Sequence, residues 1–199
     1  MQKILLALLL IVAPISPAFA SIAPTGHWTR PQVVRLIAWM TAAKDEGLGA
    51  VTAEVPALQA ALAEQDQGQL DRLATASAVR LLNAYRHGCC NAALRTAWHI
   101  APEPAWPDAT ASVLSALGSN QLDVLFRDTR PSHPSYAALG RAFAKEQDPA
   151  RRASLAANLD RWRWMPRKLG ARYLLVNTAA FEATLWENGE MIGRWAVVV

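Results

Sequence analysis

The chain has 199 residues, 52% of them hydrophobic, and its 20 Lys+Arg against 16 Asp+Glu give a formal net charge of +4 at pH 7. This apolar content is too high, and the net charge too small, for an intrinsically disordered protein. Two cysteines cannot make a disulfide-rich scaffold, and 10 Gly with 12 Pro exclude a collagen-like or low-complexity chain. The length fits one domain of ordinary size, or one domain with a fragment of another.

The first 20 residues have the features of a secretory signal peptide. Lys3 supplies a positive charge, residues 4–12 form an unbroken apolar run, and residues 18–20 read Ala-Phe-Ala, a typical cleavage site. We therefore predict cleavage after Ala20 and a periplasmic mature protein; an uncleaved membrane anchor is the less favoured alternative. Export excludes a nucleic-acid partner, and no later apolar run approaches the roughly 20 residues of a membrane span.

Between Thr29 and Pro166 the sequence predicts a series of helices. Thr29 is a suitable N-cap with Pro31 in the first turn, and apolar residues then recur at helical spacing as far as Gly47. Turn residues and apolar periodicity predict further helices at 56–64, 69–86, 108–117, 119–127, 134–146 and from 149 to before 166. The helix at 69–86 should turn one face toward the core. This face carries Leu70, Leu73, Ser77, Leu81 and Tyr85.

Three connections between these helices carry specific expectations. Gly118-Ser119 should end one helix with a C-cap and begin the next with an N-cap. Ser132 should cap the helix that starts at Pro134. The proline-rich residues 99–107 should form a loop.

After Gly170 the pattern changes to strands, which we expect at 173–176, 181–186 and 195–199. Asn188-Gly189 predicts a type I′ hairpin turn, because both central positions need positive φ. The predicted fold class is therefore mainly α, a helical scaffold domain followed by a short antiparallel β-meander that looks like a truncated β-domain. Three strands without a covering layer leave an apolar face and an open edge, so we also expect self-association through these strands.

Cys89 and Cys90, close to His87, are the strongest candidates for chemistry. A cysteine near a histidine suggests a thiol nucleophile with a base, and adjacent cysteines can form a vicinal disulfide or stay buried as small apolar residues. Catalytic Cys and His are normally adjacent in space rather than in sequence, which favours a structural or incidental role. We assign no catalytic residue.

Other residue types give weaker candidates. The histidines at 27, 87, 99 and 133 lack the paired spacing of metal ligands, so neither a metal nor a cofactor is expected. The chain has no glycine-rich phosphate loop and no Gly-x-Ser-x-Gly. Asp45-Glu46 is interpreted as a pair of surface charges and Arg151-Arg152 as a solvated helix face. The eight tryptophans are interpreted as core anchors rather than as sugar-stacking platforms.

A series of motifs from residue 158 onward carries a family resemblance. It comprises Arg-Trp-Arg-Trp-x-Pro at 161–166, Arg-Tyr-x-x-Val-Asn at 172–177 and Glu-Asn-Gly at 187–189. This series resembles the entry to the catalytic domain of the large periplasmic L,D-transpeptidases, which cross-link peptidoglycan stem peptides. The helical segments 70–88, 112–126 and 130–144 resemble the scaffold domain of the same family.

The resemblance implies a scaffold domain at 21–148, a linking helix and junction at 149–170, and the start of a catalytic β-domain at 171–199. It also implies that Trp162, Trp164 and Tyr173 are packing residues of the domain junction. The family's small peptidoglycan-binding module is missing, because residues 144–147 lead almost directly into the helix at Pro149.

The family's nucleophile lies in a Ser-x-Gly-Cys-x-Arg segment well beyond the Glu-Asn-Gly hairpin, and this segment is not among the 199 residues. His87-Gly88-Cys89 imitates part of it, but Arg86 replaces the serine. Neither cysteine is followed at the second position by arginine. No catalytic residue is therefore carried over from the family.

These observations leave three functions open. The first is an L,D-transpeptidase-related protein of peptidoglycan cross-linking, whose catalytic portion lies outside this chain by truncation or gene decay, so that residues 21–199 alone are inactive. The second is a non-catalytic periplasmic scaffold protein that binds peptidoglycan or envelope proteins. The third and weakest is a thiol-redox protein that uses Cys89-Cys90.

Overall fold

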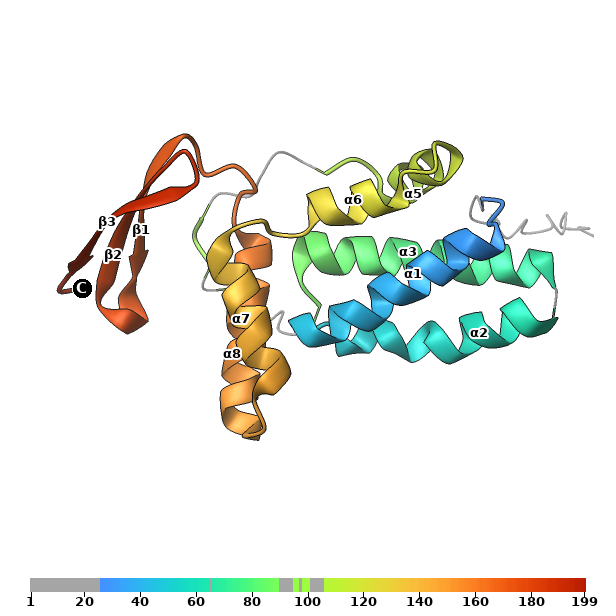
Figure 1. The fold of residues 1–199 in the computed structure, drawn as a ribbon, viewed down its shortest axis with the longest axis horizontal. Helices are drawn as coiled ribbons and strands as arrows, with labels where there is room; N and C mark the ends of the chain where they lie inside the picture. Colours follow the sequence, from blue (N-terminus) through green and yellow to red (C-terminus); the bar gives the residue numbers. More distant parts are fainter. Residues whose placement is uncertain (1–25, 65, 90–94, 97, 101–105) are drawn as a thin grey trace, which may run out of the picture.

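The structure is a computed structural model that describes residues 26–64, 66–89, 95–96, 98–100 and 106–199. The predicted signal peptide, Cys90 and most of the predicted loop at 99–107 lie outside these residues. Within them, seven α-helices precede a three-stranded antiparallel sheet, which confirms the predicted fold class. The helices α1, α2, α3, α5 and α6 form a bundle at one end, α7 and α8 form a hairpin in the middle, and the sheet lies at the other end (Figure 1). No helix of the described part is long and apolar enough to span a membrane.

Helix α1 (Arg30–Ala43) begins where its sequence predicts. The backbone N–H and the hydroxyl of Thr29 both donate to Oε1 of Gln32, at 2.9 and 2.8 Å, and Pro31 stands in the first turn. The short helix η1 (Lys44–Glu46) continues the chain to Gly47, whose φ of 77° suits a glycine at a helix end.

The next two helices are antiparallel neighbours in the bundle. After η2 (Gly49–Glu54), helix α2 (Val55–Glu64) agrees with the predicted 56–64. Helix α3 (Gln67–His87) starts with Asp66, whose side chain accepts a hydrogen bond from the Gln69 N–H at 2.9 Å.

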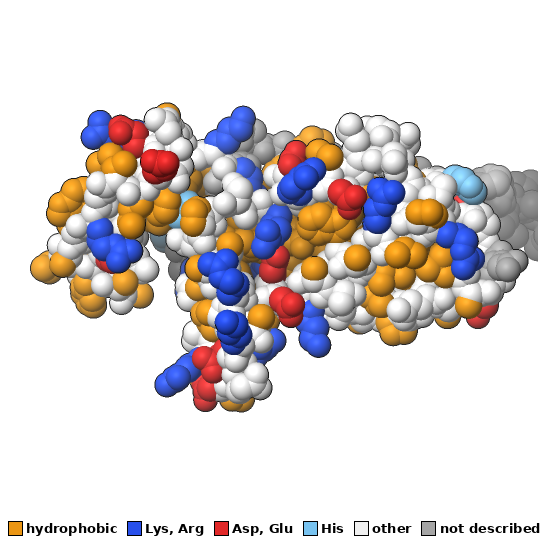
Figure 2. All heavy atoms as spheres, in the orientation of Figure 1, with side chains coloured by type: hydrophobic (Ala, Val, Ile, Leu, Met, Phe, Trp, Pro, Cys, Tyr) orange, Lys and Arg blue, Asp and Glu red, His pale blue; other side chains and the backbone are white. Residues whose placement is uncertain are grey.

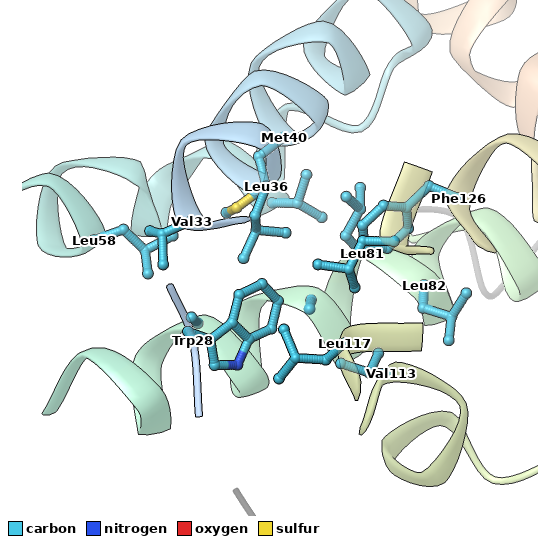
Figure 3. Close-up of a cluster of buried hydrophobic side chains, with 14 of the residues drawn as sticks. Trp28, Val33, Leu36, Met40, Leu58, Leu81, Leu82, Val113, Leu117 and Phe126 are labelled. Atoms are coloured by element: carbon cyan, nitrogen blue, oxygen red, sulfur yellow. The ribbon is translucent and has the colours of Figure 1, made fainter. Parts of the chain in front are cut away.

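Trp28 lies at the centre of the main hydrophobic core. Its side chain is 1% exposed, and its indole N–H donates to Thr75 Oγ1 at 3.0 Å. Figure 3 shows it among apolar side chains from α1, α2, α3 and α5. The predicted inner face of α3 is confirmed, because Leu70, Ser77, Leu81 and Tyr85 are buried and Leu73 packs against the core at partial burial. Burying one such large apolar side chain contributes about 1.5–3 kcal/mol.

Helices α5 (Ala109–Gly118) and α6 (Leu122–Thr129) are joined differently from the prediction. Ser119 does not start α6 but follows the end of α5, where its hydroxyl donates to Ser115 O at 2.8 Å. Asn120, at φ 55°, is the left-handed residue that ends α5, and the N–H of the next residue returns to Ala116 O at 2.7 Å. The expected caps at 118–119 are therefore wrong, because asparagine adopts the left-handed conformation that was assigned to glycine.

The hairpin of α7 (Pro134–Lys145) and α8 (Pro149–Trp164) builds a second, smaller core. Its buried residues are Tyr136, Phe143 and Leu159. The expected cap at Ser132 is wrong, because His133 occupies the N-cap and accepts the Ser135 N–H at its Nδ1, 3.1 Å away. Helix α8 ends before Pro166 as predicted, because proline disfavours helical backbone in the residue before it.

The sheet has the strand order β1-β2-β3, with β1 (Arg172–Asn177), β2 (Glu182–Glu187) and β3 (Glu190–Ala196). Asn188 and Gly189 have φ values of 50° and 86°, which confirms the predicted turn. The third strand, expected at 195–199, is wrong in its limits. A two-residue turn pairs Glu187 with Glu190, so β3 starts directly after the turn, at Glu190, and ends at Ala196.

The two faces of the sheet differ in burial. Tyr173 and Trp186, paired across β1 and β2, lie on the face toward the helices. Leu174 and Val176 are 58% and 45% exposed, and Trp195 is 50% exposed. Apolar side chains accordingly gather on the surface of the sheet (Figure 2).

Candidate functional site

The junction between the helical hairpin and the sheet is built around His133. Its ring stacks on Trp162 of α8, with centroids 4.3 Å apart and planes at 20°. The same ring makes an edge contact with Trp186 of β2 at 4.5 Å and a tilted contact with Tyr173 of β1 at 6.3 Å. Trp186 in turn stacks on Tyr173 at 6.2 Å. Trp162 and Tyr173 thus pack between the helical hairpin and the sheet, as the resemblance implies, whereas Trp164 contacts Trp98 and the end of α3.

A cavity of about 560 Å3 opens beside this aromatic stack. His133, Trp162 and Tyr173 line it together with the segment 165–171, which includes two cationic side chains, Arg167 and Lys168. Since most of this lining is apolar or aromatic, the cavity favours packing contacts over charge recognition.

The hydroxyl and imidazole groups at this cavity do not form a catalytic pair. Nδ1 of His133 accepts the Ser135 N–H, so the neutral ring carries its proton on Nε2, which is buried without a partner in the structure. Burial lowers the pKa of His133 below its ordinary value and raises the pKa of Tyr173. Both groups therefore remain neutral near pH 7. The unprotonated nitrogen of His133 already accepts the Ser135 N–H, so it is not free to act as a base for Ser132.

A buried polar network fixes α8 against η1 and α7. Arg163, whose side chain is 1% exposed, donates to Asp160 Oδ1 at 2.7 Å, to the Tyr136 hydroxyl at 2.8 Å and to Glu46 O. The Tyr136 hydroxyl donates to the Glu46 carboxylate at 2.6 Å, and Arg130 pairs with the same carboxylate at 2.6 Å. The interpretation of Glu46 as a surface charge is therefore wrong, although Asp45 is exposed. Sequence reasoning missed this network, because its members are far apart in the chain.

Arg167 ties together the C-terminal ends of three helices. Its guanidinium donates to Tyr85 O at 2.7 Å, Thr129 O at 2.8 Å, Met165 O at 2.9 Å and Arg163 O at 3.1 Å. These carbonyls belong to the ends of α3, α6 and α8, where helices leave backbone oxygens without an intrahelical partner. Arg167 thereby fixes the direction in which the chain leaves the bundle toward the sheet.

The sequence model of the Scaffold domain family matches residues 20–143. The chain belongs to this family, the scaffold domain of L,D-transpeptidases. The match runs from before α1 into α7, so it covers the whole bundle and its main core. No curated protein and no solved structure matches the chain.

In the scaffold domain, Cys89 lies just beyond the end of α3. It is disulfide-bonded, and the chain's other cysteine, Cys90, lies outside the described residues. A disulfide-bonded sulfur cannot act as a thiolate, so the arrangement does not assemble a nucleophile with His87. Gly88, at φ 72°, separates the two, and a Cβ there would come within 2.7 Å of Asp160 Oδ1. The glycine is therefore required by close packing between α3 and α8.

The remaining histidines of the scaffold domain, His27 and His99, have different surroundings. His27 is 3.5 Å from the Asp71 carboxylate at the start of the bundle, and His99 is exposed. Across the described ranges, no group of three His, Cys, Asp or Glu side chains is placed to hold a metal ion.

Proposed function

We propose that this chain is the scaffold portion of a periplasmic L,D-transpeptidase-related protein of peptidoglycan cross-linking. Its contribution is to hold the sheet at a fixed position rather than to carry out chemistry. The observation that carries this proposal is the family match over residues 20–143, which coincides with a closed helical core. Arg163 and Arg167 support it, because they fix the end of α8, from which the chain continues to the sheet.

The proposed organisation follows from the same observations. Residues 1–20 act as the signal peptide, 21–148 as the scaffold domain, 149–170 as linking helix and junction, and 171–199 as the start of a catalytic β-domain. The scaffold domain of L,D-transpeptidases is typically extracytoplasmic, which supports the periplasmic assignment. N-terminal sequencing of the exported protein should give Ser21 as the first residue, and an intact Met1 form in the cytoplasm would contradict it.

Residues 21–199 by themselves should not catalyse transpeptidation. The family reaction needs a low-pKa thiolate next to a base and donors for the developing oxyanion. Cys89 is disulfide-bonded and His87 is not arranged as its base. Incubation with a carbapenem, which acylates such nucleophiles, should leave the mass of the protein unchanged. A stoichiometric adduct on Cys89 or Cys90 would overturn this part of the proposal.

The second candidate is a non-catalytic envelope protein that binds peptidoglycan or another protein, or associates with itself through the strands. The exposed apolar side chains of the sheet favour it, because large exposed apolar patches mark interaction sites. Co-sedimentation with purified peptidoglycan tests whether the chain binds this polymer. The variant Leu174→Thr/Trp195→Thr is the matched control. Binding that survives this double substitution assigns the contact to the helices and excludes the sheet.

The thiol-redox alternative rests on the disulfide at Cys89. A redox protein would exchange this bond readily with glutathione, whereas a structural one would resist it. Alkylation and mass analysis across a series of glutathione ratios distinguishes the two. We expect the disulfide to stay oxidised in the range at which thiol oxidoreductases are half reduced.

A further inference from the structure

A second cavity, of about 470 Å3, lies where α3 and α8 end. It shares Met165 and Arg167 with the cavity beside His133, but its chemistry differs. Four arginines line it, namely Arg86, Arg95, Arg163 and Arg167, together with His87 and three tryptophans. No Asp or Glu is among the described residues that line it.

Among the described residues, the positive charges of this cavity outnumber the carboxylates that pair with them. Arg163 has its carboxylate partner, Asp160, at 2.7 Å. Arg86, which is 4% exposed, donates instead to two neutral oxygens, Pro107 O at 2.8 Å and Ser112 Oγ at 3.1 Å, and its Nε has no partner in the structure. Burial lowers the pKa of Arg86 from its ordinary value. The negative charge of Asp108 acts in the opposite direction on this pKa, although no hydrogen bond joins the two described side chains. A buried cation attracts an anion more strongly than an exposed one, because water screens it less.

Aromatic side chains form the walls beside these charges. The guanidinium carbons of Arg86 and Arg167 lie 5.0 and 5.7 Å from the centre of the Trp106 ring. Trp98 meets Trp164 edge to face at 5.6 Å. The Trp164 indole N–H donates to His87 O at 2.8 Å, which holds this wall to the end of α3.

The pKa of His87 reflects the positive electrostatic potential in this region. Its pKa is lowered first by burial and then by the positive charges of Arg95, Arg86 and Arg167. Three arginines from different positions in the sequence therefore all raise the electrostatic potential at the His87 ring. The same charges that disfavour a protonated imidazole favour a bound anion.

We propose that this cavity binds an organic carboxylate, with the carboxylate near Arg86 and Arg95 and an adjoining apolar group against Trp98 and Ile100. Arg95 is exposed and supplies donors that a ligand can reach, whereas Arg86 supplies buried charge. The planar fork of an arginine matches a carboxylate in two hydrogen bonds. The apolar lining fits the side chain next to a carboxylate better than it fits a fully hydrated phosphate. This inference does not depend on the proposed scaffold function.

The test uses the whole exported chain and three probes. N-acetyl-L-leucine supplies a carboxylate beside an apolar side chain, N-acetyl-L-leucinamide is the matched neutral compound, and inorganic phosphate is the third. Binding is followed by tryptophan fluorescence, since three tryptophans line the cavity, and by the thermal midpoint. We expect saturable binding of the acid and affinity for the amide lower by about tenfold or more, the value of one charge-assisted hydrogen bond. We expect phosphate to bind more weakly than the acid.

Two variants locate the site. Arg95→Gln should weaken binding of the acid by about tenfold without lowering the thermal midpoint, because the side chain is exposed. Arg127→Gln, at an exposed arginine of α6 outside the cavity, should leave binding unchanged. Equal binding of acid and amide, phosphate binding as tight as the acid, lack of saturable binding, or no effect of Arg95→Gln would each overturn the proposal.

Discussion

The helical bundle and the three-stranded sheet bury their apolar side chains to very different extents. Val33, Met40 and Leu81 of the bundle are completely buried, whereas Leu174 and Trp195 of the sheet are 58% and 50% exposed. Helices from several parts of the chain cover one another in the bundle, and the sheet contacts the helices mainly through the stack at His133. The bundle is therefore a self-sufficient core, and the sheet depends on the junction for the burial that it has.

A buried ion pair in helix α8 also contrasts with an exposed ion pair in the sheet. Arg163 and Asp160 are 1% and 4% exposed and lie among hydrogen-bonding partners. Arg172 and Glu187 of the sheet form a 3.6 Å pair that is 65% and 41% exposed. Water screens an exposed pair, so only the buried pair should matter measurably to stability.

The sharpest test of this comparison replaces one tryptophan in each region. Trp28→Ala should lower the free energy of unfolding by about 3–5 kcal/mol, because it removes a large buried side chain from a closed core. Trp195→Ala should cost less than about 1 kcal/mol, since half of that side chain is already in water. Urea unfolding followed by far-UV circular dichroism measures both. Equal losses would show that the sheet is as tightly packed as the bundle.

The next largest effect concerns the two ion pairs. Arg163→Met should cost about 3 kcal/mol, because it removes the cation that pairs with the buried Asp160 carboxylate at 2.7 Å. Arg172→Met should change stability by no more than about 0.5 kcal/mol, as expected for an exposed pair. The same unfolding experiment compares them. A small loss for Arg163→Met would mean that the network at Glu46 and Tyr136 does not depend on this arginine.

A smaller effect is expected from pH at the junction. Burial lowers the pKa of His133 below its ordinary value of 6.5, so the unfolded chain binds a proton more readily than the folded one. The free energy of unfolding should be constant above about pH 6.5 and should fall as pH drops below that value toward the folded pKa. Urea midpoints measured between pH 7.5 and 5 follow this change. His133→Asn, which keeps an N-cap residue, should reduce the slope, and an unchanged slope would assign it to other groups.

Substitutions on the exposed face of the sheet should have the smallest effect on stability. They should nevertheless produce a measurable change in self-association. The double substitution Leu174→Thr/Trp195→Thr removes apolar surface and keeps residues that suit strands. It should reduce self-association in sedimentation velocity with little change in unfolding. Val34→Thr, at a side chain of α1 that is 59% exposed, is the control and should have no effect. Equal association of all three proteins would contradict a contact through the sheet.

Local chemistry explains which elements could be predicted from the sequence. Thr29 with Pro31, the proline at 166 and the Asn188-Gly189 pair each act within a few residues, so their helix start, helix end and turn were correct. The same kind of cue failed at Ser119, because a neighbouring asparagine offered an equally good helix end. The limits of β3 were missed, because its apolar residues are interrupted by Gly193 and Arg194.

The junction could not be predicted, because its contacts join residues that are distant in the chain. Arg163 meets the backbone of Glu46 across 117 positions, and Arg167 meets Tyr85 across 82. Arginines lie at 161, 163 and 167, and the local sequence does not indicate that Arg163 and Arg167 make buried hydrogen bonds to distant segments. The one available signal was the family resemblance, which placed Trp162 and Tyr173 at the junction without naming their partners.

The four carbonyl bonds of Arg167 also have a mechanical consequence. A pull applied to the sheet travels along the segment after α8 and reaches this guanidinium before it reaches the core around Trp28. The load is then divided among the ends of α3, α6 and α8 instead of peeling α8 from the bundle one turn at a time. We therefore expect this single side chain to distribute such a load over three helices at once.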